Sequence, residues 1–237
     1  MLPFIVWLCL RKPIFNQPVQ LQNSVPSSNH SRPLCEKFTI FTLTMTALEQ
    51  NITTYFGVMR EDSLKSISSR FHPETLKKGD YFLKTGKPCN KLSFIKSGLL
   101  RVYKQTDDKE VTQWISTPGY FVADLSSLLF GTPARWNIES LTDAELFTIS
   151  GEDYKSIGNV VANWHELEKL FIGKCFTFLE DRVFTHLSMT AEERYLHFFE
   201  YNKELFNQVP LQYIASMLGM TPETFSRIRN KQLSSTS

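Results

Sequence analysis

The sequence predicts an α+β protein: an antiparallel β-barrel of the jelly-roll type, flanked by helices and followed by a long helix and a small C-terminal helix pair. Three observations lead to this fold class. Short apolar runs separated by turn residues recur over residues 73–150, which is typical of sandwiches and barrels. Over residues 163–187, apolar residues instead recur every three or four positions. Near the C-terminus, Gly219 separates two short helical patterns.

The composition is that of a globular protein with reduced cysteines. The chain has 237 residues, of which 42% are hydrophobic and 21% charged, so it can bury a core in one large or two modest domains. Its four cysteines form no CxxC or Cys/His cluster, which argues against a disulfide framework, structural zinc or an iron–sulfur cluster. We therefore expect no metal and a cytoplasmic location. The net charge of +2 gives no argument for nucleic acid, so such an argument needs a local patch.

Residues 1–44 differ from the rest and are predicted to be a disordered or spurious extension. Ten apolar residues precede Arg11 and Lys12, whereas a secretory signal places its positive charges before the apolar run. Ten residues are also too few to cross a membrane, so no membrane partner is predicted. Two interpretations remain, a targeting or membrane-touching peptide and sequence upstream of a true start at Met45. We favour the second.

Residues 45–160 are predicted to form the barrel domain, which begins with an ordinary helix after Met45. Strands alternate with turns that are marked by Gly, Pro or Asp. In KLSFIKSGLLRVYKQ, apolar residues occupy alternating positions on both sides of a Ser97-Gly98 turn. Further turns are predicted at Gly79-Asp80, Gly86-Lys87, Asp107-Asp108, Pro118-Gly119 and Thr142-Asp143.

A single long helix is predicted over residues 161–188, where Gly173 is the only helix breaker. Its apolar positions are Trp164, Leu167, Phe171, Phe178, Val183 and Leu187, widened by Leu170, Cys175 and Leu179. This stripe is wider than packing on the barrel alone requires. We therefore expect the helix to pair with its copy in a homodimer. The alternative, a helix that lies only on the barrel, remains open.

Residues 189–237 contain the signals of several short helices. Thr190 and Glu193 have the spacing of a capping box, and Pro210 lies in the first turn of the next helix. Gly219 is expected to end that helix in a left-handed conformation. Thr221 can cap the last helix, with Pro222 at its first position.

The spacing within 214–231 matches a helix-turn-helix, which needs a small residue where the helices touch, a glycine in the turn and apolar residues packed inward. Ala215 and Gly219 occupy the first two positions. The inward positions are Ile214, Leu218, Met220, Phe225 and Ile228. The exposed face of the last helix then comprises Thr221, Glu223, Thr224, Ser226, Arg227 and Asn230, flanked by Arg229 and Lys231. Because these side chains can contact base edges, double-stranded DNA is the predicted partner.

From about Thr46 to its end, the chain resembles the Crp/Fnr family of bacterial transcription regulators. The segments LKKGDYFLKTG (76–86), IKSGLLRVYK (95–104) and PGYFVADLSSLL (118–129) look like successive motifs of that family's cyclic-nucleotide-binding domain. PARWNI (133–138) looks like the end of its phosphate cassette, and LGMTPETFSRIR (218–229) like its recognition helix. The order and spacing of these motifs together carry the resemblance.

The resemblance implies a dimer whose DNA-binding domains are reoriented by a small effector in the barrel. Such a dimer reads two half-sites about one DNA turn apart, with Glu223 and Arg227 at the base-reading positions. Some relatives have Arg where this chain has Pro222, and the predicted domain lacks the β-hairpin wing, so the preferred DNA sequence is not implied. RNA polymerase is a further implied partner, although no polymerase-contacting surface is identifiable in the sequence.

The effector pocket departs from the nucleotide-binding pattern. Ala123-Asp124-Leu125 stands where those members have Gly-Glu-Leu, and Arg135-Trp136 where they have Arg followed by Ser or Thr. The shorter carboxylate and the bulky indole argue against a cyclic nucleotide, so no cofactor is predicted. Asp124, Arg135 and Trp136 remain candidates for binding an unknown small-molecule effector. Alternatively, Asp124 and Arg135 form a structural ion pair.

Two other functional classes remain as alternatives. In the first, the barrel is an effector-binding or interaction module whose C-terminal helices do not bind DNA. In the second, the chain is an enzyme, for which His165 with Glu166 and Glu168 is the best acid–base candidate. Since the sequence has no nucleophile elbow, P-loop or metal triad, we predict no enzymatic activity and interpret these residues as a solvated helix face.

Overall fold

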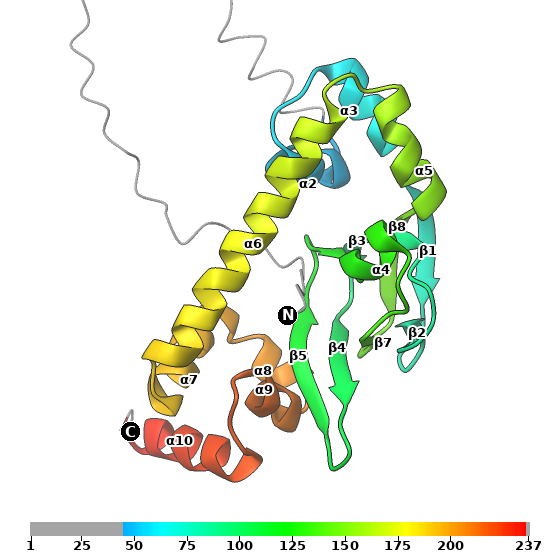
Figure 1. Ribbon diagram of the computed structural model, residues 1–237. Coiled ribbons are helices and arrows are strands. Elements are labelled where there is room, and N and C mark those ends of the chain that lie inside the picture. Colours follow the sequence, from blue (N-terminus) through cyan, green and yellow to red (C-terminus); the bar gives the residue numbers. More distant parts are fainter. Residues whose placement is uncertain (1–44, 236–237) are drawn as a thin grey trace, which may run out of the picture.

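Two antiparallel four-stranded sheets enclose one hydrophobic core in the computed structural model, which describes residues 45–235 (Figure 1). The predictions for residues 1–44 lie outside this range. The sheet orders are β1-β8-β3-β6 and β2-β7-β4-β5. The strands are β1 (His72–Leu76), β2 (Tyr81–Leu83), β3 (Lys91–Ser97), β4 (Leu100–Gln105), β5 (Glu110–Ser116), β6 (Phe121–Val122), β7 (Asn137–Ser140) and β8 (Ala144–Ser150). The predicted antiparallel β domain is thus present as a two-sheet sandwich.

The predicted turns separate these strands. Gly98 joins β3 to β4 and has φ of 92°, a conformation that side chains disfavour. The Asp107-Asp108 turn joins β4 to β5, and the Thr142-Asp143 turn joins β7 to β8. Gly79, Gly86 and Gly119 likewise have positive φ. The turn chemistry was therefore a reliable guide to the strand boundaries.

Helices cover the ends and one side of the sandwich. They are α2 (Ala47–Phe56), α3 (Glu61–Ser68), α4 (Leu125–Phe130), α5 (Gly151–Ser156), the 3₁₀ helix η1 (Ile157–Asn159) and the long α6 (Trp164–Ser188). The 25 residues of α6 confirm the predicted long helix. Helix α4 was not predicted, because its six residues are too few to show a helical apolar period and they lie between predicted strands.

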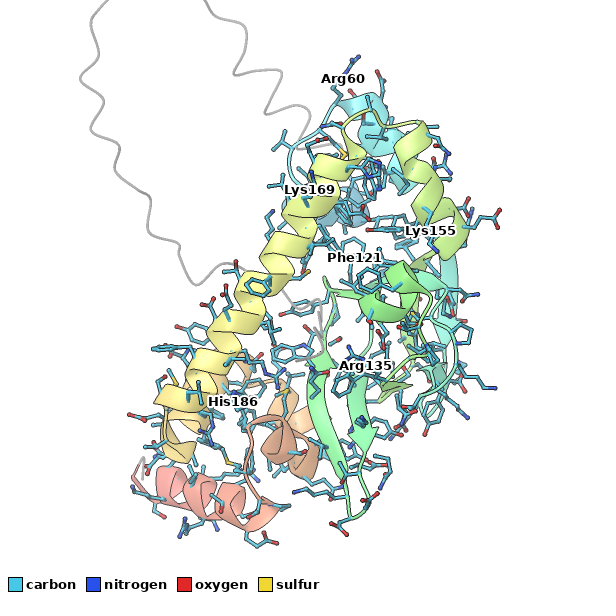
Figure 2. The ribbon with its side chains drawn as sticks, viewed as in Figure 1. Arg60, Phe121, Arg135, Lys155, Lys169 and His186 are labelled. Atoms are coloured by element: carbon cyan, nitrogen blue, oxygen red, sulfur yellow. The ribbon has the colours of Figure 1, made fainter. Side chains whose placement is uncertain are left out.

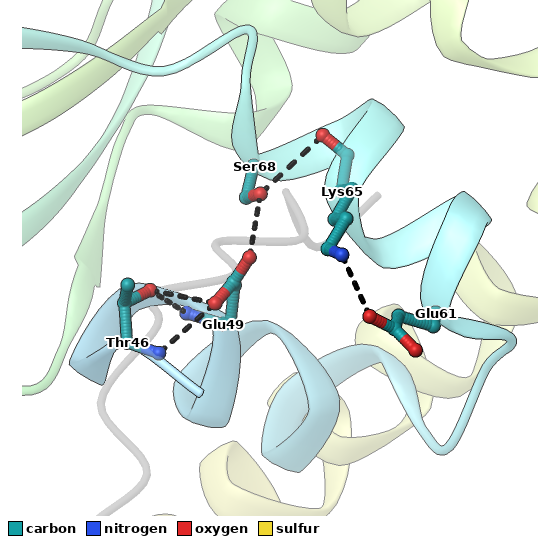
Figure 3. A network of polar contacts seen from close by, with 5 residues as sticks. All are labelled: Thr46, Glu49, Glu61, Lys65 and Ser68. Atoms are coloured by element: carbon teal, nitrogen blue, oxygen red, sulfur yellow. Dashed lines mark hydrogen bonds and ion pairs between the residues drawn. The ribbon is translucent and has the colours of Figure 1, made fainter. Parts of the chain in front are cut away.

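A polar network joins α2 to α3 (Figure 3). The Thr46 hydroxyl accepts the backbone N–H of Glu49 at 3.2 Å, and the Glu49 carboxylate accepts the Thr46 N–H at 2.9 Å. This reciprocal capping box satisfies donors at the start of α2. The Ser68 hydroxyl donates to the other Glu49 oxygen at 3.0 Å, so the same carboxylate holds the end of α3.

Helix α6 packs its first half on the sandwich. Its buried residues are Trp164, Leu167, Phe171 and Cys175. Phe56 of α2 stacks between Trp164 and Phe171, with centroid distances of 5.2 and 4.3 Å. Phe121 of β6, labelled in Figure 2, contacts Phe56 from the sheet side. This aromatic cluster holds α2 and α6 to the sandwich.

Within the described residues, four helices follow α6 and build a second core. They are α7 (Ala191–Asn202), α8 (Leu205–Gln208), α9 (Leu211–Met217) and α10 (Pro222–Ser235). The Thr190–Glu193 capping box at the start of α7 is confirmed. The second core also includes Leu99 and Ile115, which lie beside β4 and in β5. No helix within residues 45–235 is long and apolar enough to span a bilayer.

Candidate nucleic-acid interface

The turn between α9 and α10 has the predicted chemistry. Gly219 follows α9 with φ of 69°, which confirms the left-handed residue expected there. The Thr221 hydroxyl accepts the backbone N–H of Thr224 at 3.2 Å and so caps α10, which begins at Pro222. Proline costs nothing at this position because its missing N–H has no partner within the helix. The turn therefore fixes where α10 starts.

The inner faces of α9 and α10 pack together. Ala215 is fully buried, as expected for the contact between the two helices, and Phe225 is 1% exposed. The other buried residues of this pair are Ile214, Met217, Leu218 and Ile228, whereas the predicted Met220 is only partly buried. The rings of Tyr195 and Phe206 contact the Phe225 ring at 5.2 and 5.9 Å. One side of α10 is thereby held against α7, α8 and α9.

The opposite side of α10 faces solvent and carries the predicted candidates. Thr221, Glu223, Ser226, Arg227 and Asn230 are exposed. Thr224 is the exception, being half-buried beside Thr221, whose hydroxyl lies 3.3 Å from its own. Five of the six candidates thus lie on one accessible surface, which we call the α10 outer face.

Glu223 and Arg227 are the chemically most specific residues of the α10 outer face. They are four residues apart, so one turn of helix places them on the same side. Hydrogen bonds from its own backbone N–H and from Thr221 lower the pKa of Glu223, which keeps the carboxylate ionised at the start of α10. A carboxylate can accept from cytosine N4, and a guanidinium can donate two hydrogen bonds to guanine.

The basic end of α10 is partly neutralised, which the sequence did not reveal. The Lys231 ammonium binds both carboxylate oxygens of Glu192 in α7, at 2.9 and 3.0 Å. Gln232 donates to the same carboxylate at 2.9 Å. These residues lie about 40 positions apart in sequence, so only the fold brings them together. The ammonium group of Lys231 is therefore already occupied by Glu192 and is less available to a phosphate than the sequence suggests.

Of the three predicted effector residues, Asp124 contributes its side chain to a buried hydrogen-bond network, and Arg135 contributes its backbone N–H. Asp124 is buried and caps α4 by accepting the Ser127 N–H at 3.1 Å. Its other oxygen accepts the backbone N–H of Arg135 at 3.0 Å. The Ser127 hydroxyl accepts the Cys89 N–H at 2.8 Å, and the Cys89 sulfur accepts the Asp124 N–H at 3.4 Å. Burial raises the pKa of the Cys89 thiol, so it stays protonated in this network.

The acid–base candidate of the enzyme alternative lies on one stretch of α6. His165 is exposed, and its Nδ1 lies 3.8 Å from a Glu168 oxygen on the same helix. Within residues 45–235 no cluster of three or more His, Cys, Asp or Glu could hold a metal ion. The His165–Glu168 pair is a contact between neighbouring turns of α6.

Comparisons with known proteins identify the sandwich. Residues 73–159 match the family model described as the cyclic nucleotide-binding domain. FixK2 from Bradyrhizobium japonicum superposes with a TM-score of 0.59 at 18% identity, covering 70% of this chain and 86% of that one. No curated protein sequence matches the chain significantly.

Two further solved structures share this arrangement. A protein from Eubacterium rectale, assigned to transcriptional regulators of the Crp/Fnr family, has a TM-score of 0.59 at 21% identity, with 74% and 85% coverage. The cyclic di-GMP-responsive global regulator CLP from Xanthomonas campestris has a TM-score of 0.58 at 16% identity, with 75% and 93% coverage. At these identities the likeness concerns the fold.

The residues present do not fit a cyclic nucleotide, although residues 73–159 match the model of the cyclic nucleotide-binding domain. Both oxygens of the Asp124 carboxylate already accept backbone N–H groups, and the side chain is buried, so it is not presented to a ribose hydroxyl. Trp136 belongs to the hydrophobic core and is 9% exposed. With an indole at this position, the residue after Arg135 has no hydroxyl to donate to a phosphate.

Cyclic AMP at millimolar concentration should therefore leave the thermal midpoint of the full chain unchanged, because a ligand stabilises only by binding the folded state. Differential scanning fluorimetry or calorimetry measures this directly. A concentration-dependent rise of about 2 °C or more, expected for a domain of this size if roughly 1 kcal/mol of binding were gained, would contradict the misfit.

Proposed function

We propose that this chain is a sequence-specific DNA-binding transcriptional regulator of the Crp/Fnr type that acts as a homodimer. The observation that carries the proposal is the two-sided character of α10. One side is buried against α7, α8 and α9, and the other presents Glu223 and Arg227 to solvent. A helix held in this way can enter the major groove of DNA as a recognition helix.

We propose three functional parts. Residues 45–160 form the sensing domain for a small-molecule effector, residues 161–188 the dimerisation helix, and residues 189–237 the DNA-binding domain. The descriptions of CLP as a global regulator and of the Eubacterium rectale protein as a transcriptional regulator support this assignment, since the chain superposes on most of both.

The second copy of the chain is the proposed occupant of the outer face of α6. Apolar residues recur there in steps of four and three at Ile172, Phe176, Leu179, Val183 and Leu187. Within this stripe, Val183 and Leu187 are 51% and 82% exposed. Solvent contact on such a stripe is unfavourable, and a matching stripe on a second α6 would bury it in the manner of a coiled coil.

Replacing Arg227 with alanine should weaken binding to the preferred DNA by at least about 10- to 100-fold, because each copy in the dimer loses a bidentate contact that contributes about 1–3 kcal/mol. The preferred site is obtained by enriching a randomised double-stranded DNA pool on the full chain. Affinity is then measured by fluorescence anisotropy at fixed salt, since ionic strength changes the electrostatic contribution. The Arg227→Ala variant should also discriminate less between the four base pairs at one position of the site.

Lys155→Ala is the matched control, because Lys155 is exposed on α5 at the other end of the molecule (Figure 2) and its loss removes the same charge. Its affinity should stay within about twofold of the wild type. Equal losses in the two variants would contradict recognition by the α10 outer face. Failure of the wild type to enrich any sequence would favour an interaction module instead.

A further inference from the structure

The outer surface of the β4–β5 hairpin is buried under α9 of the same chain. Leu100 and Val102 of β4 point into the sandwich core, so Arg101 and Tyr103 point outward. An outward arginine is ordinarily exposed, yet Arg101 is 2% exposed. Helix α9 packs against β5 beside it, and Figure 1 shows the helix alongside the hairpin.

Arg101 joins three elements. Its guanidinium lies over the Tyr213 ring of α9, with the central carbon 3.6 Å from the ring centroid, and over the Tyr103 ring at 4.1 Å. Its Nε donates to the Thr112 hydroxyl at 2.9 Å, and Nη1 donates to Glu110 at 2.7 Å. A buried guanidinium needs such partners, and here they are one carboxylate, one hydroxyl and two aromatic rings.

Two independent contacts fix the same helix. The backbone N–H of Thr112 donates to the Ser216 hydroxyl of α9 at 2.9 Å. The β4–β5 register shifts between Val102 and Tyr103, which leaves Gln113 as the extra residue of a bulge. The carbonyl of Gln113 accepts from Arg182 of α6, and the same Arg182 nitrogen lies 3.4 Å from the Met217 carbonyl of α9.

We propose that Arg101 is a positioning residue that locks the α9–α10 pair to the β4–β5 hairpin of its own chain. The lock leaves the α10 outer face exposed, so it orients the recognition helix and does not cover it. In a dimer, two locked chains hold their α10 helices at one fixed separation. Arg101 would thereby set the half-site spacing that the protein accepts, an inference that rests on the proposed function.

Arg101→Met and Tyr213→Ala each remove the stacking, and Tyr213→Phe keeps the ring as the matched control. Arg101→Met is expected to fold because methionine fills a similar volume, and the Glu110 side chain it leaves behind is 42% exposed. Binding is measured with duplexes that carry the enriched half-site once, or twice at spacings that differ by one or two base pairs.

The wild type and Tyr213→Phe should prefer one spacing by about tenfold or more, whereas Arg101→Met and Tyr213→Ala should reduce this preference to about twofold. Affinity for the single half-site should remain unchanged, a result that general damage to the DNA-binding domain would not give. Unchanged spacing preference in both variants, or an equal loss on the single half-site, would overturn the proposal.

Amide hydrogen exchange tests the lock without DNA. The Thr112 N–H, which donates to Ser216, should exchange about tenfold faster in Arg101→Met and Tyr213→Ala than in the wild type and Tyr213→Phe. Unchanged exchange overturns the lock, whatever the DNA result. If the wild type binds no specific DNA while exchange accelerates as expected, the proposed function fails but the lock itself is supported.

Discussion

Gly98→Ala should destabilise the folded chain by about 3–5 kcal/mol, the sum of backbone strain and steric overlap. Gly98 has φ of 92°, which a residue with a Cβ adopts only with strain. A Cβ at this position would lie 2.6 Å from the Ala144 Cα and 2.6 Å from the Asp143 carbonyl oxygen. These are backbone atoms of the opposing turn, so no side-chain rotation relieves the overlap.

The opposing turn cannot move away easily because hydrogen bonds join the two turns. The Leu99 N–H donates to the Thr142 hydroxyl at 3.0 Å, and the Leu141 N–H donates to the Leu99 carbonyl at 2.7 Å. Separating the turns would break these bonds and disturb Leu99, which is part of the second core. The substitution therefore affects both the sandwich and its contact with the C-terminal helices.

Gly86→Ala is the control that introduces backbone strain without steric overlap. Gly86 has φ of 80°, but a Cβ there meets nothing within 4 Å. This variant should lose only about 1–2 kcal/mol. Equilibrium urea unfolding at one fixed protein concentration measures both variants, since association would otherwise change the apparent stability. Equal losses for the two alanines would show that the close approach at Gly98 relaxes without cost.

Local signals predicted the parts of the fold whose causes are local. Gly98 and Gly219 mark turns because each needs positive φ, and Thr190 marks a helix start because its partner Glu193 is three residues away. The length of α6 follows from its unbroken apolar period. By contrast, strand order depends on pairing between distant segments, such as β1 with β8, and no local residue pattern determines it.

The candidate site likewise contains residues that local sequence predicts and contacts that it does not. Glu223 and Arg227 follow from the periodicity of one short helix, so their exposure was predictable. The contact of Lys231 with Glu192 and the stacking of Arg101 on Tyr213 connect segments 39 or more residues apart. Arg101 in particular looks like an ordinary solvent-facing strand residue in the sequence, because alternation places it opposite the core. Only the docking of α9 explains its burial.

Val183→Glu should convert the dimer to monomers, weakening self-association by at least about 100-fold. In a dimer formed through the outer face of α6, the substitution places two carboxylates in an apolar seam, where burying an unpaired charge costs at least 1–3 kcal/mol per copy. In the separate chain Val183 is 51% exposed, so a carboxylate there remains hydrated and the monomer should keep its stability. Sedimentation equilibrium at several concentrations gives the association constant.

Thr177→Glu introduces the same charge on the same helix as a control. Thr177 is exposed and lies about a third of a turn away from both the outer seam and the buried stripe, by the 3.6-residue period. It should leave association within about threefold of the wild type, since a surface charge contributes little. Equal effects of the two glutamates would point to general charge repulsion, and a monomeric wild type would contradict the α6 dimer outright.

The consequence for DNA follows from linkage between association and binding. A dimer engages its second half-site as an intramolecular step, which raises affinity by roughly 10²–10⁴-fold over a single domain. Val183→Glu should therefore lose most of its affinity for the two-half-site duplex at low protein concentration, while its affinity for one half-site equals that of the wild type. Loss on both duplexes would instead mean that α6 supports the α10 outer face directly, from its C-terminal end, where the His186 ring lies beside the Gly219 turn.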